Sequence, residues 1–413
     1  MEFADAVRFY SLPARDPHQP RAEVEAAALT QVLRHRVGRR GRPRRLAYLD
    51  STFPWTRSGF RYHEAQALLE LAPDTMFFSL WEMEDPFPAT VHRLTDFPRI
   101  AAEAGITDAY AVFQLFLAGL TGLRPSDPAP AHFMEGPDLS RAMWRAGIRL
   151  HGSIYPGGGL TITEAGLSQT RTLAQRMEST FSYVPEVLAN VPEVTSVDQA
   201  FTETRFYAKS DDRWRNTSRI VCIFAADAPP RKGLDVALRA VAGLSPQDFH
   251  LHVVGPHEHR RDELPHELAT FHGWLSPEQL RDLHARAHVF ISPVSSESPG
   301  AARAFAGVTD GFPTQAAADA MSSGCLLISA NPASDHRVLT PGKHYLDCDP
   351  DVEQLRARLQ QIVGAVASMR QIADAGSLQV RDRMDVRRGV AQKLSHMGFQ
   401  VPREFQVLPR SAV

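Results

Sequence analysis

The sequence predicts an α/β fold made of two Rossmann-like domains that face each other across a cleft. Short apolar segments alternate with segments whose apolar residues recur at helical spacing, and this order is typical of open parallel sheets. One polar segment, residues 209–218, interrupts the alternation, which then starts again. The 413 residues suffice for two domains of about 200 residues each. We expect an N-terminal domain over 1–212, a C-terminal domain over 213–380, and a tail over 381–413 that can pack back on the first domain.

The first half is expected to contain strand 45–50, a helix after Gly59, strand 75–81, a helix and a further apolar segment in 100–120, a helix and a strand in 139–154, and a helix and a strand in 160–184. The second half is expected to contain strand 219–226, helix 231–244, strand 248–255, short strand 269–275, helix 276–287 with Ser276 as its N-cap, strand 288–294, helix 313–324, strand 325–331 and helix 349–369. Ligands of such sheets bind at the carboxyl ends of the strands, so the chemistry is expected in the loops that follow them.

Composition excludes several classes of protein. The formal net charge of -2 argues against a partner such as nucleic acid. One basic run, residues 34–45, fits a solvated loop, with binding to an anionic membrane surface or to nucleic acid as the alternative. The three cysteines lack disulfide or zinc spacing and suggest reduced thiols. Neither a signal peptide nor an apolar run of about 18 residues is found, so we expect a cytoplasmic protein with no integral membrane segment.

The segment DGFPTQAAADAM, residues 310–321, has the features of an anion site. Pro313 suits the first position of a helix, and Gly311 lets a ligand approach the backbone. The amides and dipole at such a helix start favour phosphate. Asp319 could accept hydrogen bonds from sugar hydroxyls, and Asp310 could contact a hydroxylated group beyond the phosphates. The alternative is a capped helix with an incidental Asp319.

The motifs around this segment resemble a known enzyme family. RKGLDVALRAV, FHLHVVG, FHGWLSPEQLRDLHARAHVFISP, DGFPTQAAADAMSSGCLLISAN and DVEQLRARL follow one another between Arg231 and Leu359. This order is similar to the C-terminal domain of GT-B fold glycosyltransferases, and most similar to the retaining glycosyltransferase family 4 (GT4). The first half matches the family in layout.

The resemblance implies a donor site. In the family, the acid inside the motif helix binds the nucleotide ribose, which falls on Asp319, and the acid at the start of the motif lies by the donor sugar, which falls on Asp310. The lysine of the KG pair, Lys232, binds the diphosphate and stabilises the leaving group. Arg231 can assist Lys232. The alternative for Lys232 is a surface charge before a helix.

Further roles follow from the same resemblance. The residues expected at the sugar hydroxyls and diphosphate are Gly311, Phe312, Pro313 (which contributes no amide) and Thr314. Gly273 and Trp274 match the loop that contacts the nucleobase, and the loop at Gly59 packs against phosphates or acceptor. His151, expected at the end of a strand, matches a histidine that faces the reacting sugar; a structural histidine is the alternative.

The sequence also departs from the family. Its two acids are aspartates rather than glutamates, and they lie one residue further apart. Asp227 stands where the family often has an arginine. An insertion at 295–308 precedes the motif and can adapt the site to an unusual sugar or act as a lid.

We therefore expect a retaining glycosyltransferase that moves a sugar from a nucleoside-diphosphate sugar to a small-molecule acceptor, for example in natural-product biosynthesis. A non-catalytic nucleotide-sugar-binding partner protein and a nucleotide-sugar hydrolase or epimerase remain alternatives. No metal or other cofactor is implied, because DCDPD (347–351) fits a loop and helix cap better than a metal motif. The donor nucleotide (UDP or GDP), the acceptor's nucleophile and the oligomeric state stay open.

Overall fold

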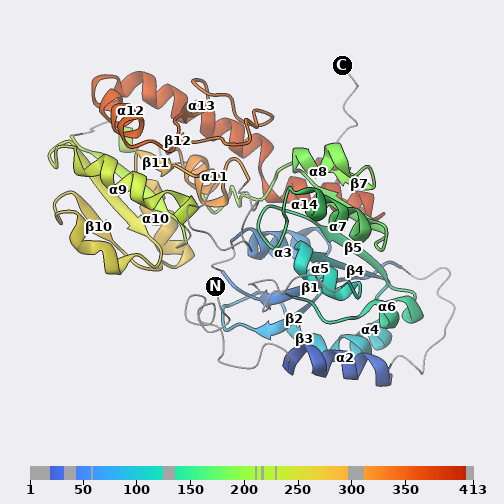
Figure 1. The fold of residues 1–413 in the computed structure, drawn as a ribbon. Helices are drawn as coiled ribbons and strands as arrows, with labels where there is room; N and C mark the ends of the chain where they lie inside the picture. Colours follow the sequence, from blue (N-terminus) through green and yellow to red (C-terminus); the bar gives the residue numbers. More distant parts are fainter. Residues whose placement is uncertain are drawn as a thin grey trace, which may run out of the picture. The chain divides into compact units, whose positions relative to one another are not determined.

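The computed structural model describes residues 19–31, 43–56, 59–123, 135–209, 212–214, 218–227, 230–295 and 311–405. Its contacts divide the chain into two compact units. Unit 1 comprises Met1–Asp198, Arg303–Thr309 and Arg387–Val413, and unit 2 comprises Gln199–Ala302 and Asp310–Val386. Figure 1 shows that helices flank the sheet of each unit. The predicted class, two parallel α/β domains, is confirmed.

Unit 1 contains a sheet whose described strands are all parallel and lie in the order β3-β2-β1-β4-β5-β6-β7. The strands are β1 (Leu46–Phe53), β2 (Met76–Glu82), β3 (Val91–Arg93), β4 (Asp108–Val112), β5 (Arg149–Ser153), β6 (Ser179–Ser182) and β7 (Val194–Ser196). The helices are α2 (Gln19–Gln31), α3 (Gly59–Leu71), η2 (Leu94–Asp96), α4 (Phe97–Ala104), α5 (Gln114–Leu120), α6 (Ser140–Ala146), α7 (Glu164–Ala174), α8 (Pro185–Asn190), α14 (Val386–His396) and η8 (Arg403–Phe405).

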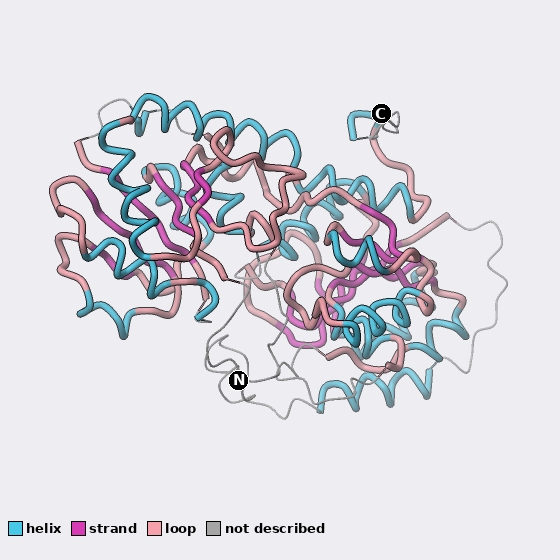
Figure 2. The backbone as a smooth tube through the Cα atoms, turned by 45° about the horizontal axis from the view of Figure 1, so that its top comes forward, coloured by secondary structure: helices cyan, strands magenta, loops and turns pink. Residues whose placement is uncertain are grey.

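Unit 2 contains a second parallel sheet, in the order β10-β9-β8-β11-β12-β13. The strands are β8 (Ile220–Ala225), β9 (Phe249–Val254), β10 (Ala269–Phe271), β11 (Val289–Ser292), β12 (Leu326–Ser329) and β13 (Leu346–Asp347). The helices are η4 (Asp212–Trp214), η5 (Pro230–Lys232), α9 (Leu234–Ala242), η6 (Glu258–Glu263), α10 (Pro277–Arg286), α11 (Gln315–Ser322), α12 (Val352–Gly364) and α13 (Val366–Arg383). Figure 2 distinguishes the strands of each sheet from the helices around them.

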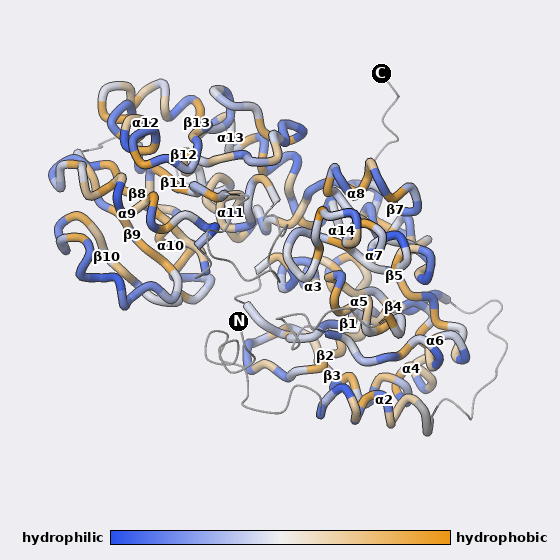
Figure 3. Tube along the Cα trace, in the orientation of Figure 1, coloured by the Kyte–Doolittle hydropathy of each residue, from blue (hydrophilic) through white to orange (hydrophobic). Residues whose placement is uncertain are grey.

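The apolar runs of the sequence become strands that are buried on both faces. Every residue of β1 and of β12 is buried, as expected when helices cover a parallel sheet on both sides. Helix α9 buries Leu234, Ala237, Leu238 and Val241, one stripe at helical spacing. Figure 3 shows hydrophobic residues along the strands of each sheet.

The segment that connects the two halves belongs to unit 2 by its contacts. The sequence predicts a boundary near residue 212, whereas the two compact units of the structure divide between Asp198 and Gln199. Thr202 explains this position, because its amide donates to the Met384 carbonyl and its carbonyl accepts from the Val386 amide, both at 2.9 Å. Residues that follow Asp198 are thereby attached to the end of α13.

The order of strands in unit 2 indicates where along the sheet a ligand is expected to bind. From β8 the chain adds β9 and β10 on one side, and then returns to place β11, β12 and β13 on the other. The reversal lies between β8 and β11. In open α/β sheets, the loops at the carboxyl ends of the two strands at such a reversal diverge and leave a crevice for a ligand.

Candidate functional site

The loop after β8 carries the predicted cations to the carboxyl edge of the unit 2 sheet. Arg231 and Lys232 are half-buried and end the short helix η5, directly before α9. Gly233 caps α9 with φ +80°, and a Cβ there would lie 2.2 Å from the Pro293 carbonyl oxygen. The Ser295 amide donates to the Arg231 carbonyl at 2.9 Å. The loops after β8 and β11 are therefore fixed to each other at the reversal of strand order.

The loops after β9 and β10 meet at the same edge. The Gly255 amide donates to the Gly273 carbonyl at 2.9 Å, and the His257 ring is 2.9 Å from the Ala226 carbonyl. Gly273 has φ +66°, a left-handed conformation that favours glycine, and the Glu258 carboxylate lies beside it. Trp274 follows it and is half-buried. Gly273 and Trp274 thus lie at the same edge as Lys232, with the loop after β9 between the two loops.

Helix α11 starts two residues later than Pro313. Thr314 is the N-cap, and its hydroxyl accepts from the Ala317 amide at 3.4 Å. The sequence predicts Pro313 as the first helical residue, but in the structure Pro313 precedes the N-cap. The peptide bond between Phe312 and Pro313 is cis. A polar residue at the cap offers the helix start an acceptor that proline lacks. The first-turn amides remain directed out of the helix start, as an anion site requires.

Asp319 lies inside α11 and is 4% exposed. The Gln315 amide nitrogen donates to both of its carboxylate oxygens, each at 2.9 Å. Burial raises the pKa of Asp319 to about 8, and hydrogen bonds from Gln315 and Thr202 oppose that rise only in part. The carboxyl group is thus enclosed and engaged within unit 2. Its assignment to the ribose stays a prediction.

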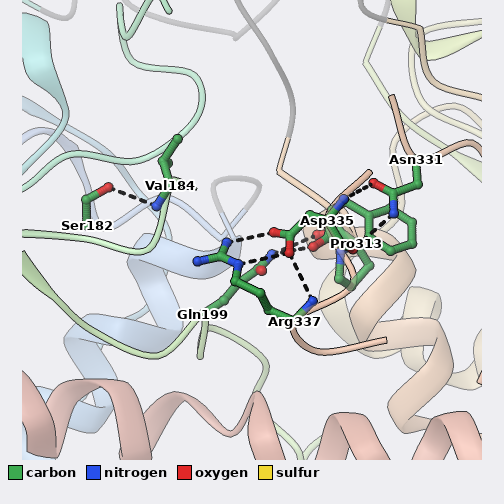
Figure 4. A network of polar contacts seen from close by, with 8 residues as sticks. Ser182, Val184, Gln199, Pro313, Asn331, Asp335 and Arg337 are labelled. Atoms are coloured by element: carbon green, nitrogen blue, oxygen red, sulfur yellow. Dashed lines mark hydrogen bonds and ion pairs between the residues drawn. The ribbon is translucent and has the colours of Figure 1, made fainter. Parts of the chain in front are cut away.

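A polar network beside the start of α11 was not anticipated from the sequence (Figure 4). Gln199 is 4% exposed, and its amide nitrogen donates to the Phe312 carbonyl at 2.9 Å. After β12, the Asp335 carboxylate accepts two hydrogen bonds from the Arg337 guanidinium, at 2.9 and 2.7 Å. Burial works against ionisation of Asp335, but the bonds from Arg337 hold its pKa below the usual value.

Nothing in the local sequence marked these residues, except that Asp335 and Arg337 are oppositely charged and two positions apart. Asn331 closes the same loop, because its side chain accepts from the Asp335 amide and donates to the Asp335 carbonyl, both at 3.0 Å. This loop follows β12 and so lies at the carboxyl edge of the sheet. It therefore places Arg337 at the same edge of the sheet as the loops after β8 and β10.

His151 does not end its strand. Strand β5 continues to Ser153, and His151 pairs with Tyr110, in the middle of β4. Its two ring nitrogens lie 3.0 Å from Asp108 Oδ1 and 3.2 Å from Ser179 Oγ, and Asp108 and Ser179 are the first residues of their strands. The side chain is 2% exposed, and these contacts direct it toward the amino edge of the sheet. This corrects the expected position at the strand end and favours the structural alternative.

Gly59 and Asp310 are the two remaining residues that the sequence predicts in the ligand site. Gly59 is the first residue of α3, after β1 at the carboxyl edge of the unit 1 sheet, so it lies where a ligand loop is expected. Asp310 and most of the insertion 295–308 lie outside the described residues, and their roles stay predictions.

In the part of the chain that the structure describes, no group of three or more His, Cys, Asp or Glu side chains is arranged to hold a metal ion. The helix cap expected in DCDPD is present, because Asp351 caps α12 by accepting from the Gln354 amide at 2.9 Å, whereas Asp347 ends strand β13. That no metal is required stays a prediction. None of the described helices has both the length and the apolar character needed to span a bilayer.

Comparisons with known proteins support the resemblance. Residues 218–364 match the family model described as glycosyl transferases group 1. The comparison with curated proteins gives no match. Among solved structures, HepE from Anabaena in complex with UDP and glucose has a TM-score of 0.63 at 13% identity, over 86% of this chain and 99% of HepE. Sucrose-phosphate synthase from Thermosynechococcus elongatus has a TM-score of 0.60 at 13% identity, over 86% and 98% of the chains.

A glycosyltransferase from Rickettsia africae is also similar, with a TM-score of 0.59 at 9% identity, over 86% of this chain and 97% of the other. These structures share the two-domain GT-B fold with this chain. The match covers the whole segment from β8 to α12, which holds Lys232, Gly273 and α11. Together, the fold and the family match indicate a GT-B glycosyltransferase.

Proposed function

We propose that the protein is a retaining glycosyltransferase of the GT4 type, which transfers a sugar from a nucleoside-diphosphate sugar to a small-molecule acceptor. The observation that carries this proposal is the position of three predicted binding segments at one edge of the unit 2 sheet. The loop of Arg231 and Lys232, the loop of Gly273 and Trp274 and the start of α11 all lie at the carboxyl edge of one parallel sheet. UDP-glucose is the first donor to test, because HepE has been solved with it.

The chemistry that these residues support is the departure of a diphosphate. As the bond between the anomeric carbon and the diphosphate breaks, negative charge grows on the departing oxygen. Lys232, with Arg231 beside it, supplies fixed positive charge, and the first-turn amides of α11 supply oriented donors. The acceptor's nucleophilic atom bonds to the anomeric carbon from the face that the diphosphate leaves, and its proton passes to a diphosphate oxygen. The configuration of the sugar is therefore retained.

Calorimetric titration tests the role of Lys232. Wild-type protein is expected to bind UDP more tightly than uridine, and Lys232→Ala is expected to weaken UDP about 10- to 100-fold while uridine is unaffected, because a hydrogen bond to a charged group contributes about 1.5–3 kcal/mol. Lys343, an exposed lysine of the same unit, gives the control Lys343→Ala. A change in UDP affinity below threefold for Lys232→Ala contradicts the assignment.

Incubation with a donor sugar alone tests the reaction class. Without acceptor, a transferase is expected to leave UDP-glucose largely intact for hours. Rapid release of glucose or of an epimer would instead identify a hydrolase or an epimerase.

A further inference from the structure

Three histidines cluster on one face of the strand pair β9 and β10, at the edge of the unit 2 sheet. His250 and His252 are two positions apart on β9 and therefore project from the same face. Thr270 of β10 pairs with His252, so His272, two positions further, lies on that face as well. All three histidines are half-buried. The chain continues from His272 directly into Gly273, which the sequence predicts at the nucleobase.

The rings of this cluster are joined by hydrogen bonds that depend on their protonation. His252 Nδ1 lies 2.8 Å from His272 Nε2, a contact in which one nitrogen donates and the other accepts. His250 Nδ1 lies 3.1 Å from the Glu267 carbonyl, which can only accept, so His250 Nε2 is left to accept from the Thr270 hydroxyl at 2.9 Å. The contact between His252 and His272 therefore exists only while at least one of these two rings is neutral.

The charged groups around the cluster oppose a positive charge on it. Arg219, before β8, and Arg286, at the end of α10, both lower the pKa of His252 through their charge. Arg219 also donates to the Glu267 carbonyl, which attaches it to the segment before β10. The carboxylates of that segment and of α10 have other partners: Glu267 pairs with His266 at 3.1 Å, Asp282 with Arg281 at 2.8 Å, and Glu278 accepts from Ser276 at 2.9 Å.

The three rings are held neutral in the folded strand pair. Burial, followed by the charges of the neighbouring histidines and arginines, lowers the pKa of His252 to about 3. The pKa values of His250 and His272 are also lowered, chiefly by burial. In an exposed chain the same side chains titrate near 6.5. A released strand therefore takes up protons that the paired strand excludes, so the stability that the cluster contributes is present above pH 6.5 and is lost as the pH falls below it.

We propose that His252 and His272 form a pH-sensitive switch that holds β10 on β9 near neutral pH and releases it in acid. When both rings are charged, two donors face each other and repel, and the strands separate. The His272 amide donates to the Val253 carbonyl, and the Gly273 carbonyl accepts from the Gly255 amide, both at 2.9 Å. Release of β10 therefore withdraws the Gly273 loop from the carboxyl edge and weakens nucleotide binding. Only this last step rests on the proposed function.

Hydrogen exchange measured by mass spectrometry tests the switch without a ligand. Each histidine that gains a proton on release raises the opening constant about tenfold between pH 7.5 and pH 5.5. In wild-type protein, protection of 268–274, corrected for the intrinsic exchange rate, is expected to fall at least about 100-fold between these pH values. The double variant His252→Gln/His272→Gln, whose side chains stay polar but do not titrate, is expected to show a fall of about tenfold or less. His266→Gln, at an exposed histidine of the same segment, is expected to keep the full fall.

Three results would overturn the switch. The first is protection of 268–274 that does not change with pH. The second is a fall of equal size in wild type and in the double variant; if that variant does not fold, His272→Gln alone is used, and it is expected to remove about tenfold of the fall. The third is an equal fall in 326–329, in strand β12, because unit 2 would then open as a whole rather than at β10.

Calorimetry with UDP at the same two pH values tests the link to binding. From pH 7.5 to pH 5.5, wild type is expected to lose at least about threefold in affinity relative to the double variant, because release of β10 lowers the fraction of binding-competent protein. The titration of UDP itself cancels in this comparison. A ratio of affinities that does not change overturns the link from β10 to the nucleotide. If neither protein binds UDP at either pH, the proposed function fails, while the exchange measurement still decides the switch.

Discussion

At the scale of single residues, Asp319 links the site to folding stability. Its pKa is raised from 3.8 to about 8 by burial in the folded chain, so between these values the folded state holds a proton that the unfolded state has lost. The contribution of this group to stability is therefore greatest below pH 4 and is lost as the pH rises toward 8. One such proton corresponds to about 1.4 kcal/mol per pH unit.

Asp319→Asn removes this titration. The free energy of unfolding of the variant, minus that of wild type, is expected to increase from pH 5 to pH 8, by up to about 1.4 kcal/mol per unit. Urea unfolding at four pH values measures the difference, in which contributions from all other groups cancel. A difference that stays constant over this range would show that Asp319 titrates normally in the folded chain.

The sequence predicts site residues but not the partners of each side chain. Lys232 and Gly273 are predicted from the family resemblance of their motifs, and their roles stay predictions. The contacts of Gln315 and Gln199 have no local signal, because they depend on carbonyls and a carboxylate supplied by the fold. For His151 the predicted position at a strand end is wrong, since the residue lies inside β5 and its ring contacts Asp108, which is far away in sequence but adjacent across the sheet.

At the scale of elements, Gly233, between η5 and α9, allows the loops after β8 and β11 to approach closely. Gly233→Ala adds a Cβ at positive φ and against the Pro293 carbonyl. Gly342→Ala is the matched control, because Gly342 also has positive φ, at +74°, but has open space around it. We expect the control to lose about 1 kcal/mol and Gly233→Ala to lose at least about 2 kcal/mol more, together with UDP affinity. If thermal unfolding shows the same loss of stability for Gly233→Ala and Gly342→Ala, the loops after β8 and β11 can move apart at no cost in free energy.

The strands of unit 2 were predictable because β8, β9, β11 and β12 are apolar runs with turn residues at their ends. Strands β4 and β7 of unit 1 were harder to find. The residues of β4, DAYAV, follow a helical segment and precede another, so periodicity alone does not separate them. Strand β7 has only three residues and lies at the edge of the sheet. Its pairing with β6 depends on tertiary contacts rather than on local propensity.

At the scale of the whole molecule, unit 1 is completed by residues from the opposite end of the chain. Helix α14 places Lys393 in the unit 1 core, where its ammonium group pairs with Glu64 of α3 and donates to the Tyr155 hydroxyl at 2.8 Å. Lys393 is 2% and Glu64 3% exposed. Tyr110 also bonds Glu64, so the pair belongs to a network that joins α3, β4 and α14.

Lys393→Met is expected to destabilise unit 1 by about 3–5 kcal/mol, because it leaves Glu64 buried without its counter-charge. Adding Glu64→Gln is expected to recover most of the loss, since the remaining group is neutral and can still bond Tyr110. Hydrogen exchange should locate the effect: protection falls in 107–112 and 149–155 of unit 1 and is unchanged in 249–254 of unit 2. Lys343→Met, at an exposed lysine, should change neither. If protection instead fell equally in both units, they would unfold as one cooperative body, and the division at Asp198 would not correspond to independent stability.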